Sequence, residues 1–172
     1  MKKMDEIKND TQTAAQSATL TALIKRGGIY YDIKGNACQE IMANVINLID
    51  DKLFPHDKDA LLRAVMEREA LISTGIENGI ALPHPRTPLL EEGDDPFVAI
   101  AFPAAPPADW ETPDNSKVRT IFLIVSMSPK QHIDVMSKIG FLCQQEKFYK
   151  LVCAQSPKEE IIGAIEEIEN EW

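Results

Sequence analysis

The apolar run Val118-Arg-Thr-Ile-Phe-Leu-Ile-Val125 decides the fold class, together with a second run, Phe97-Val-Ala-Ile-Ala-Phe102. The β-branched and aromatic residues in both runs favour β-strands. Both runs are almost continuously apolar, which is typical of strands that are covered on both faces. Helical patterns lie on either side of them, so we expect an α/β protein with its sheet between helices.

The other elements follow from hydrophobic periodicity and from turn residues. A helix is expected from about residue 17, capped by Ser17 or Thr19 and stopped by Gly27-Gly28. Gly79-Ile-Ala-Leu82 is predicted to be a short buried strand. Residues 1–17 are polar and are expected to be a flexible tail, which leaves one domain over residues 18–172. We expect a further strand at 29–33 and further helices at 37–51, 57–72, 131–145, 146–154 and 157–169.

Composition limits the possible functions. The chain has 172 residues and a net charge of 18 − 27 = −9, which disfavours nucleic acid and anionic lipid as partners. No apolar run approaches the roughly 20 residues that span a bilayer, and the first residues are not a secretory signal. Three cysteines without a C-x-x-C spacing predict neither disulfides nor zinc ligands, and they are expected to be small, partly buried side chains. The three cysteines are Cys38, Cys143 and Cys153. The sequence thus predicts a cytoplasmic protein without membrane insertion.

The most unusual chemistry lies at His84, which follows a predicted strand and stands between Pro83 and Pro85. Both prolines restrict the backbone, so the imidazole is expected on a stiff support. A neutral histidine ring is a credible phosphoryl acceptor near pH 7. The alternative is an ordinary loop histidine.

A phosphorylated histidine needs hydrogen-bond donors, and Arg68, Arg86 and His132 are the candidates. Backbone N–H groups near Ser73, Thr74 and Gly75 could add an anion-binding concavity. Each candidate has a structural alternative: Arg68 could pair with a neighbouring glutamate, Arg86 could be a surface charge, and His132 could be a polar residue at a helix start. His56 is given no role, and the histidine spacing does not suggest a metal site.

Read together, Glu67-Arg-Glu-Ala-Leu-Ile-Ser-Thr-Gly75 and Asn78-Gly-Ile-Ala-Leu-Pro-His84 resemble the enzyme IIA domain of the bacterial phosphoenolpyruvate phosphotransferase system. The resemblance is to the mannitol/fructose class, which includes the nitrogen-regulatory IIA proteins. Asp109-Trp-Glu-Thr-Pro-Asp114 and Gln131-His-Ile-Asp-Val-Met136 extend it, so that it covers about residues 18–172.

The resemblance implies a mixed β-sheet flanked by helices on both faces. It implies that a phosphorylated HPr-type protein donates a phosphoryl group to His84, with Arg68 and His132 as catalytic partners. Ser73, Thr74, Asn78 and Arg86 are the expected phosphate-binding residues. No metal or organic cofactor is implied, and the chain would be a phosphotransferase component rather than a stand-alone enzyme.

The sequence leaves three functions open. The first is a phosphocarrier with a regulatory output in nitrogen or general metabolism, read by a partner protein. The second is a fructose- or mannitol-class component that passes the phosphoryl group to a separate IIB protein for sugar uptake. The third is a binding module that keeps the fold without being phosphorylated, and the presence of Arg68, His84 and His132 argues against it.

Overall fold

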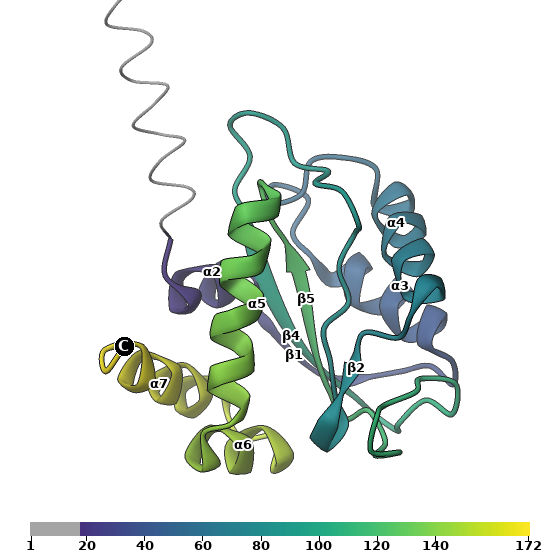
Figure 1. Cartoon of the computed structure of the whole chain (residues 1–172). Coiled ribbons are helices and arrows are strands. Elements are labelled where there is room, and N and C mark those ends of the chain that lie inside the picture. Colours follow the sequence, from purple (N-terminus) through teal and green to yellow (C-terminus); the bar gives the residue numbers. More distant parts are fainter. Residues whose placement is uncertain (1–17) are drawn as a thin grey trace, which may run out of the picture.

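A computed structural model describes residues 18–172, and at their centre lies one mixed, five-stranded sheet (Figure 1). Its strand order is β1-β4-β5-β3-β2. β4 pairs parallel with β1 and antiparallel with β5, while β3 pairs parallel with β5 and antiparallel with β2. The strands are β1 (Ile29–Ile33), β2 (Gly75–Ile76), β3 (Ile80–Ala81), β4 (Phe97–Pro103) and β5 (Thr120–Val125).

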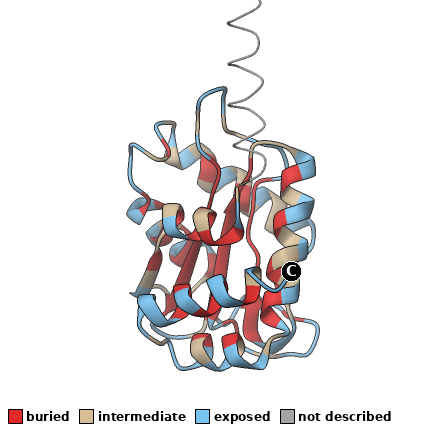
Figure 2. Cartoon of the chain, turned by 90° about the vertical axis from the view of Figure 1, so that its left-hand side faces the viewer, coloured by how far each residue is buried: buried red, intermediate tan, exposed pale blue. Residues whose placement is uncertain are grey.

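The two apolar runs of the sequence are the central strands β4 and β5, and every residue in them is buried (Figure 2). Successive side chains of a strand point to opposite faces, so an unbroken apolar run supplies two cores. Val98, Ile100 and Phe102 join one hydrophobic cluster, whereas Phe97, Ala99 and Ala101 join the other. The predicted sheet between helices is therefore confirmed.

The helices divide between these two clusters. The first cluster is covered by α2 (Leu20–Gly27), α5 (Pro129–Cys143), α6 (Glu146–Cys153) and α7 (Lys158–Glu169). The second is covered by α3 (Cys38–Leu48) and α4 (Lys58–Leu71), which Figure 1 shows on the other side of the sheet. Each helix lies within a few residues of its predicted place.

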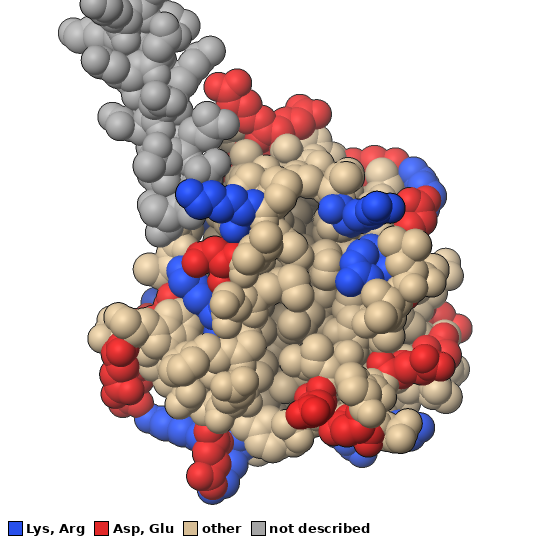
Figure 3. Space-filling model, in the orientation of Figure 1, with Lys and Arg blue, Asp and Glu red and all other residues tan. Residues whose placement is uncertain are grey.

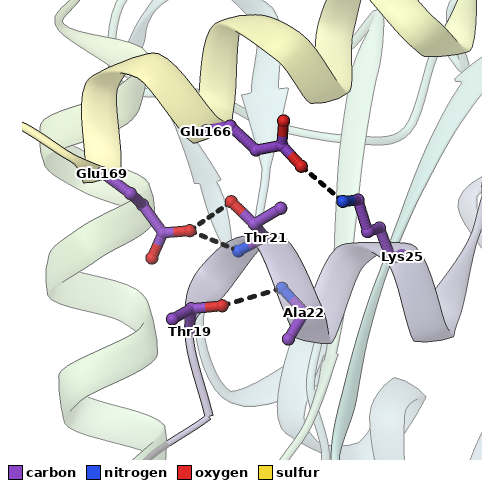
Figure 4. Close-up of polar contacts among 6 residues, drawn as sticks. All are labelled: Thr19, Thr21, Ala22, Lys25, Glu166 and Glu169. Atoms are coloured by element: carbon purple, nitrogen blue, oxygen red, sulfur yellow. Dashed lines mark hydrogen bonds and ion pairs between the residues drawn. The ribbon is translucent and has the colours of Figure 1, made fainter.

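The start of α2 is held by its own cap and by α7 (Figure 4). The Thr19 hydroxyl accepts from the N–H of Ala22, as the sequence predicts for Thr19, whereas Ser17 lies outside the described residues. The Glu169 carboxylate accepts from the N–H groups of Leu20 and Thr21, at 2.8 and 2.6 Å. A carboxylate from α7 therefore satisfies backbone donors that α2 cannot pair within itself.

Some local predictions are wrong. The sequence predicts no strand between the helix at 57–72 and Gly79, but Gly75–Ile76 form the strand β2, which pairs with β3. The helix predicted over 37–51 ends earlier, because α3 stops at Leu48, which is 51 % exposed. Cys153 is also exposed, at the end of α6. The expected flexible tail, residues 1–17, lies outside the described residues.

Within residues 18–172, no helix combines the length and the apolar character that a membrane span requires.

Candidate functional site

The topology brings three separate segments to the edge of the sheet that is formed by the ends of its strands. The parallel neighbours β3 and β5 have their carboxyl ends at this edge. Ligand sites of α/β sheets commonly lie at such carboxyl ends. The pairing with β5 continues two residues beyond the end of β3, because the N–H of Ile124 in β5 donates to the carbonyl of Pro83 at 3.0 Å. The antiparallel strand β2 begins at this edge, where the N–H of Leu82 donates to the carbonyl of Thr74 at 3.1 Å.

His84 lies at this edge and is almost covered, at 6 % exposure. Its Nδ1 is 2.7 Å from the carbonyl oxygen of Leu82. A carbonyl oxygen only accepts hydrogen bonds, so Nδ1 carries the proton and Nε2 keeps a free lone pair. Burial, followed by the charge of Arg68, lowers the pKa of His84 and keeps the ring neutral at pH 7.

His132 lies beside it, in the first turns of α5. Its ring centroid is 4.2 Å from that of His84, and the two planes are inclined by 43°. Ser128 caps the helix, with its hydroxyl accepting from the N–H of Gln131 at 3.2 Å. Burial, with His84 and Arg68 nearby, lowers the pKa of His132 to about 4. Two neutral imidazoles therefore lie next to each other.

Arg68 belongs to the last turn of α4, and its positive charge lowers the pKa of both histidines. Its Nη1 donates to the carbonyl of Ile72 at 2.8 Å, which holds the guanidinium at the helix end. Among the described residues it pairs with no carboxylate, so the alternative of a glutamate ion pair is not observed. The structure thus brings together the three residues that the sequence predicts to be catalytic.

Ser73 and Thr74 lie next to this edge, but their groups already have partners. The Ser73 hydroxyl donates to the carbonyl of Glu111 at 2.6 Å and accepts from the N–H of Gly75 at 3.0 Å. The N–H and the hydroxyl of Thr74 both donate to Glu69, at 2.8 and 2.5 Å. In this structure these groups fix the backbone that enters β2 rather than offering free donors to an anion.

Asn78 and Arg86 are placed differently from the three central residues. Asn78 forms the tip of the β2–β3 hairpin, at the opposite end of β3 from His84. It has a left-handed backbone (φ 65°), and its N–H donates to the Asp114 carboxylate at 3.0 Å. Arg86 is exposed two residues after His84 and has no hydrogen bond or ion pair within residues 18–172.

Sequence reasoning missed Glu69 and the partner of the His84 ring. Glu69 follows Arg68 directly, yet only the folded turn shows that its carboxylate accepts two bonds from Thr74. The Leu82 carbonyl could not be selected from the sequence, because any nearby backbone oxygen could have bonded Nδ1. Nothing in the residue types marks either contact.

Exposed apolar side chains lie close to Arg68 and His132 in the chain. Leu71 and Ile72 end α4 beside Arg68, and Ile133 follows His132; they are 64 %, 70 % and 69 % exposed. Figure 3 shows Lys and Arg side chains on both sides of a hollow in the upper half of the face that carries α4 and α5. Exposed apolar groups around a locally positive hollow are typical of a surface that a protein partner covers.

His56 is not part of this site. Its Nε2 is 2.5 Å from the Asp94 carboxylate, and that bond raises the pKa of His56. Asp94 belongs to the acidic loop 91–95, so this pair ties the loop to the segment between α3 and α4.

Comparison with known families and structures gives concordant results. A family model described as "Phosphoenolpyruvate-dependent sugar phosphotransferase system, EIIA 2" matches residues 22–168. The fructose-specific EIIABC component of Bacillus subtilis is 25 % identical over 149 residues, which are 85 % of this chain but 23 % of that protein. This chain therefore spans about a quarter of that relative.

Two further relatives are similar over nearly their whole length. The nitrogen regulatory protein of Escherichia coli is 26 % identical over 163 residues, or 94 % of each chain. The crystal structure of the nitrogen regulatory protein IIA-Ntr from Neisseria meningitidis superposes with a TM-score of 0.72 at 20 % identity. It covers 84 % of this chain and 97 % of that one.

Proposed function

The chain belongs to the EIIA type 2 family of the phosphoenolpyruvate-dependent sugar phosphotransferase system, and from this we propose that His84 is its phosphoryl acceptor. The observation that supports this most directly is the 2.7 Å bond from Nδ1 to the Leu82 carbonyl. It assigns the ring proton to Nδ1 and leaves Nε2 as the nucleophile, next to His132 and Arg68.

In the proposed reaction, a phosphorylated HPr-type protein presents its phosphoryl group to Nε2 of His84. The Nε2 lone pair forms the new bond to phosphorus, and the bond to the donor atom breaks with its electron pair. The His84 ring becomes cationic, and its Nδ1–H keeps donating to Leu82. Such a transfer needs positioning and charge stabilisation more than covalent chemistry by the protein.

The other residues act on the phosphoryl oxygens. Arg68 holds a full positive charge near both rings, and releasing it from the Ile72 carbonyl frees an N–H to bond an oxygen. His132 is neutral before transfer, and the approach of an anion raises its pKa, so it can donate through a ring N–H. We assign Ser73, Thr74 and Arg86 to the support and periphery of this site, and give Asn78 a role in the hairpin tip.

The surface around the site supports a protein donor rather than a small-molecule substrate. His84 is almost covered, and exposed apolar side chains follow Arg68 and His132 in the chain. A partner that covers Leu71, Ile72 and Ile133 would exclude water from the phosphoryl group, which favours transfer over hydrolysis.

We propose that the output is regulatory, with the phosphorylation state read by a partner protein in the cytoplasm. The match over 94 % of the E. coli nitrogen regulatory protein supports this. The second candidate is transfer to a IIB protein for sugar uptake, which the similarity to a fructose-specific EIIABC component favours.

The test is phosphorylation in a defined mixture. The full chain is incubated with phosphoenolpyruvate, enzyme I and an HPr-type carrier, and its mass is measured. We expect one acid-labile phosphoryl group, lost in His84→Ala and retained in the control His56→Ala. No gain of mass with an active donor, or an undiminished gain in His84→Ala, would contradict the proposal.

A further inference from the structure

A continuous series of hydrogen bonds links Glu69 to the His84 ring. The Glu69 carboxylate accepts from the N–H and the hydroxyl of Thr74, at 2.8 and 2.5 Å. The carbonyl of Thr74 accepts from the N–H of Leu82 at 3.1 Å. The carbonyl of Leu82 then accepts from Nδ1–H of His84 at 2.7 Å.

Each bond in this series constrains the next. Leu82 lies beyond the two paired residues of β3, so its bond to Thr74 is what continues the β2–β3 pairing toward the acceptor. Thr74 in turn stands between the end of α4 and β2, where few backbone bonds fix it. The two bonds to Glu69, together with the bonds of Ser73 to Glu111 and Gly75, therefore fix the Thr74 carbonyl and with it the Leu82 carbonyl.

The charge of Glu69 also favours the cationic ring that His84 becomes in the proposed transfer. It raises the pKa of His84 and so opposes burial and the charge of Arg68, which lower it. A carboxylate near a ring that gains positive charge stabilises the charged form. Of the charged or titratable groups that act on His84, Arg68 and Glu69 come from α4 and His132 comes from α5.

We propose that Glu69 is a positioning residue for His84. By clamping Thr74 it keeps the Leu82 carbonyl on Nδ1, which holds the ring in the tautomer with a free Nε2. This rests on the proposed role of His84 as acceptor. It assigns to Glu69 a function that works through backbone atoms of two other residues.

The test measures the tautomer of His84 without any phosphoryl donor. ¹⁵N chemical shifts of the labelled ring distinguish a protonated Nδ1 from a protonated Nε2. We expect the wild type to show one tautomer, protonated at Nδ1, and Glu69→Ala to show a mixture. Losing a hydrogen bond of ordinary strength changes such a ratio, and the rate of phosphoryl acceptance with it, between about two- and tenfold.

Matched variants separate positioning from general loss of structure. Glu67→Ala removes an exposed carboxylate two residues away on the same helix and should leave the tautomer and the rate unchanged. Thr74→Val loses the hydroxyl bond to Glu69 and should shift the ratio of tautomers. Thr74→Ser keeps a hydroxyl and should show the wild-type ratio. These two variants also test the clamp if Glu69→Ala does not fold.

The outcomes are distinct. An unchanged tautomer in folded Glu69→Ala, or in Thr74→Val if Glu69→Ala does not fold, overturns the inference. A shifted tautomer supports it, even if His84 then proves not to accept phosphate, in which case the proposed function fails and the positioning role stands.

Discussion

Replacing His132 by glutamine should make the protein less sensitive to acid. Burial, followed by the nearby His84 and the charge of Arg68, lowers the pKa of His132 from 6.5 to about 4. Between these values the unfolded chain binds a proton that the folded protein does not. The neutral ring therefore contributes stability fully above about pH 6.5, and this contribution is lost as the pH falls toward 4.

The size of the effect follows from the two pKa values. Each tenfold difference in proton affinity is worth about 1.4 kcal/mol. At pH 4.5 the unfolded histidine is almost fully protonated and the folded one about one quarter protonated, which corresponds to roughly 2.5 kcal/mol. Because the ring is half-buried, we expect between about 1 and 2.5 kcal/mol.

The assay is urea unfolding of wild type and His132→Gln at pH 7.5 and pH 4.5. Relative to wild type, the variant should gain about 1 to 2.5 kcal/mol at the lower pH. The carboxylates titrate in both proteins and cancel in this comparison. His56→Gln is the control of opposite sign, because the bond to Asp94 raises the pKa of His56. Parallel pH dependences for wild type and His132→Gln would refute the lowered pKa of His132 and the burial that causes it.

Four further substitutions have defined outcomes. Arg68→Ala should slow phosphoryl acceptance by roughly 10² or more in rapid-quench measurements, because the oxygens lose the positive charge that Arg68 holds near both rings. A rate within threefold of wild type contradicts this. Gly75→Ala places a Cβ 2.2 Å from the carbonyl oxygen of Glu111 and should lower the free energy of unfolding in urea by about 1 to 3 kcal/mol. Gly163→Ala, in open space on α7, should raise it by about 0.5 to 1 kcal/mol. Glu169→Ala should cost about 1 to 2 kcal/mol by removing the cap of α2, and a loss below 0.3 kcal/mol, on the order of a surface substitution, would show that water replaces it.

Much of the fold was predictable because it rests on local patterns. The apolar runs of β4 and β5 identify a sheet covered twice, and the helices follow from their periodicity and caps. The strand β2 was not predictable, because two residues carry no periodic signal and only pairing with β3 defines them. The directions of the strands could not be predicted either, because each connection is compatible with a parallel or an antiparallel pair.

The site was partly predictable for a similar reason. His84, Arg68 and His132 belong to a specific motif, and the structure brings them together. The spacing of Asn78 says nothing about the hairpin that turns it away from His84. The roles of Leu82 and Glu69 depend on hydrogen bonds to backbone atoms, and these bonds cannot be predicted from residue types.

The position of the phosphoryl group on the ring is the most direct test of the central claim. The ¹⁵N-labelled chain, phosphorylated by an HPr-type carrier, is examined for ³¹P–¹⁵N coupling. Bonding of Nδ1 to the Leu82 carbonyl predicts a single phosphoryl group on Nε2 of His84. Coupling to Nδ1 instead, or a phosphoryl group on His56 or His132, would contradict the account.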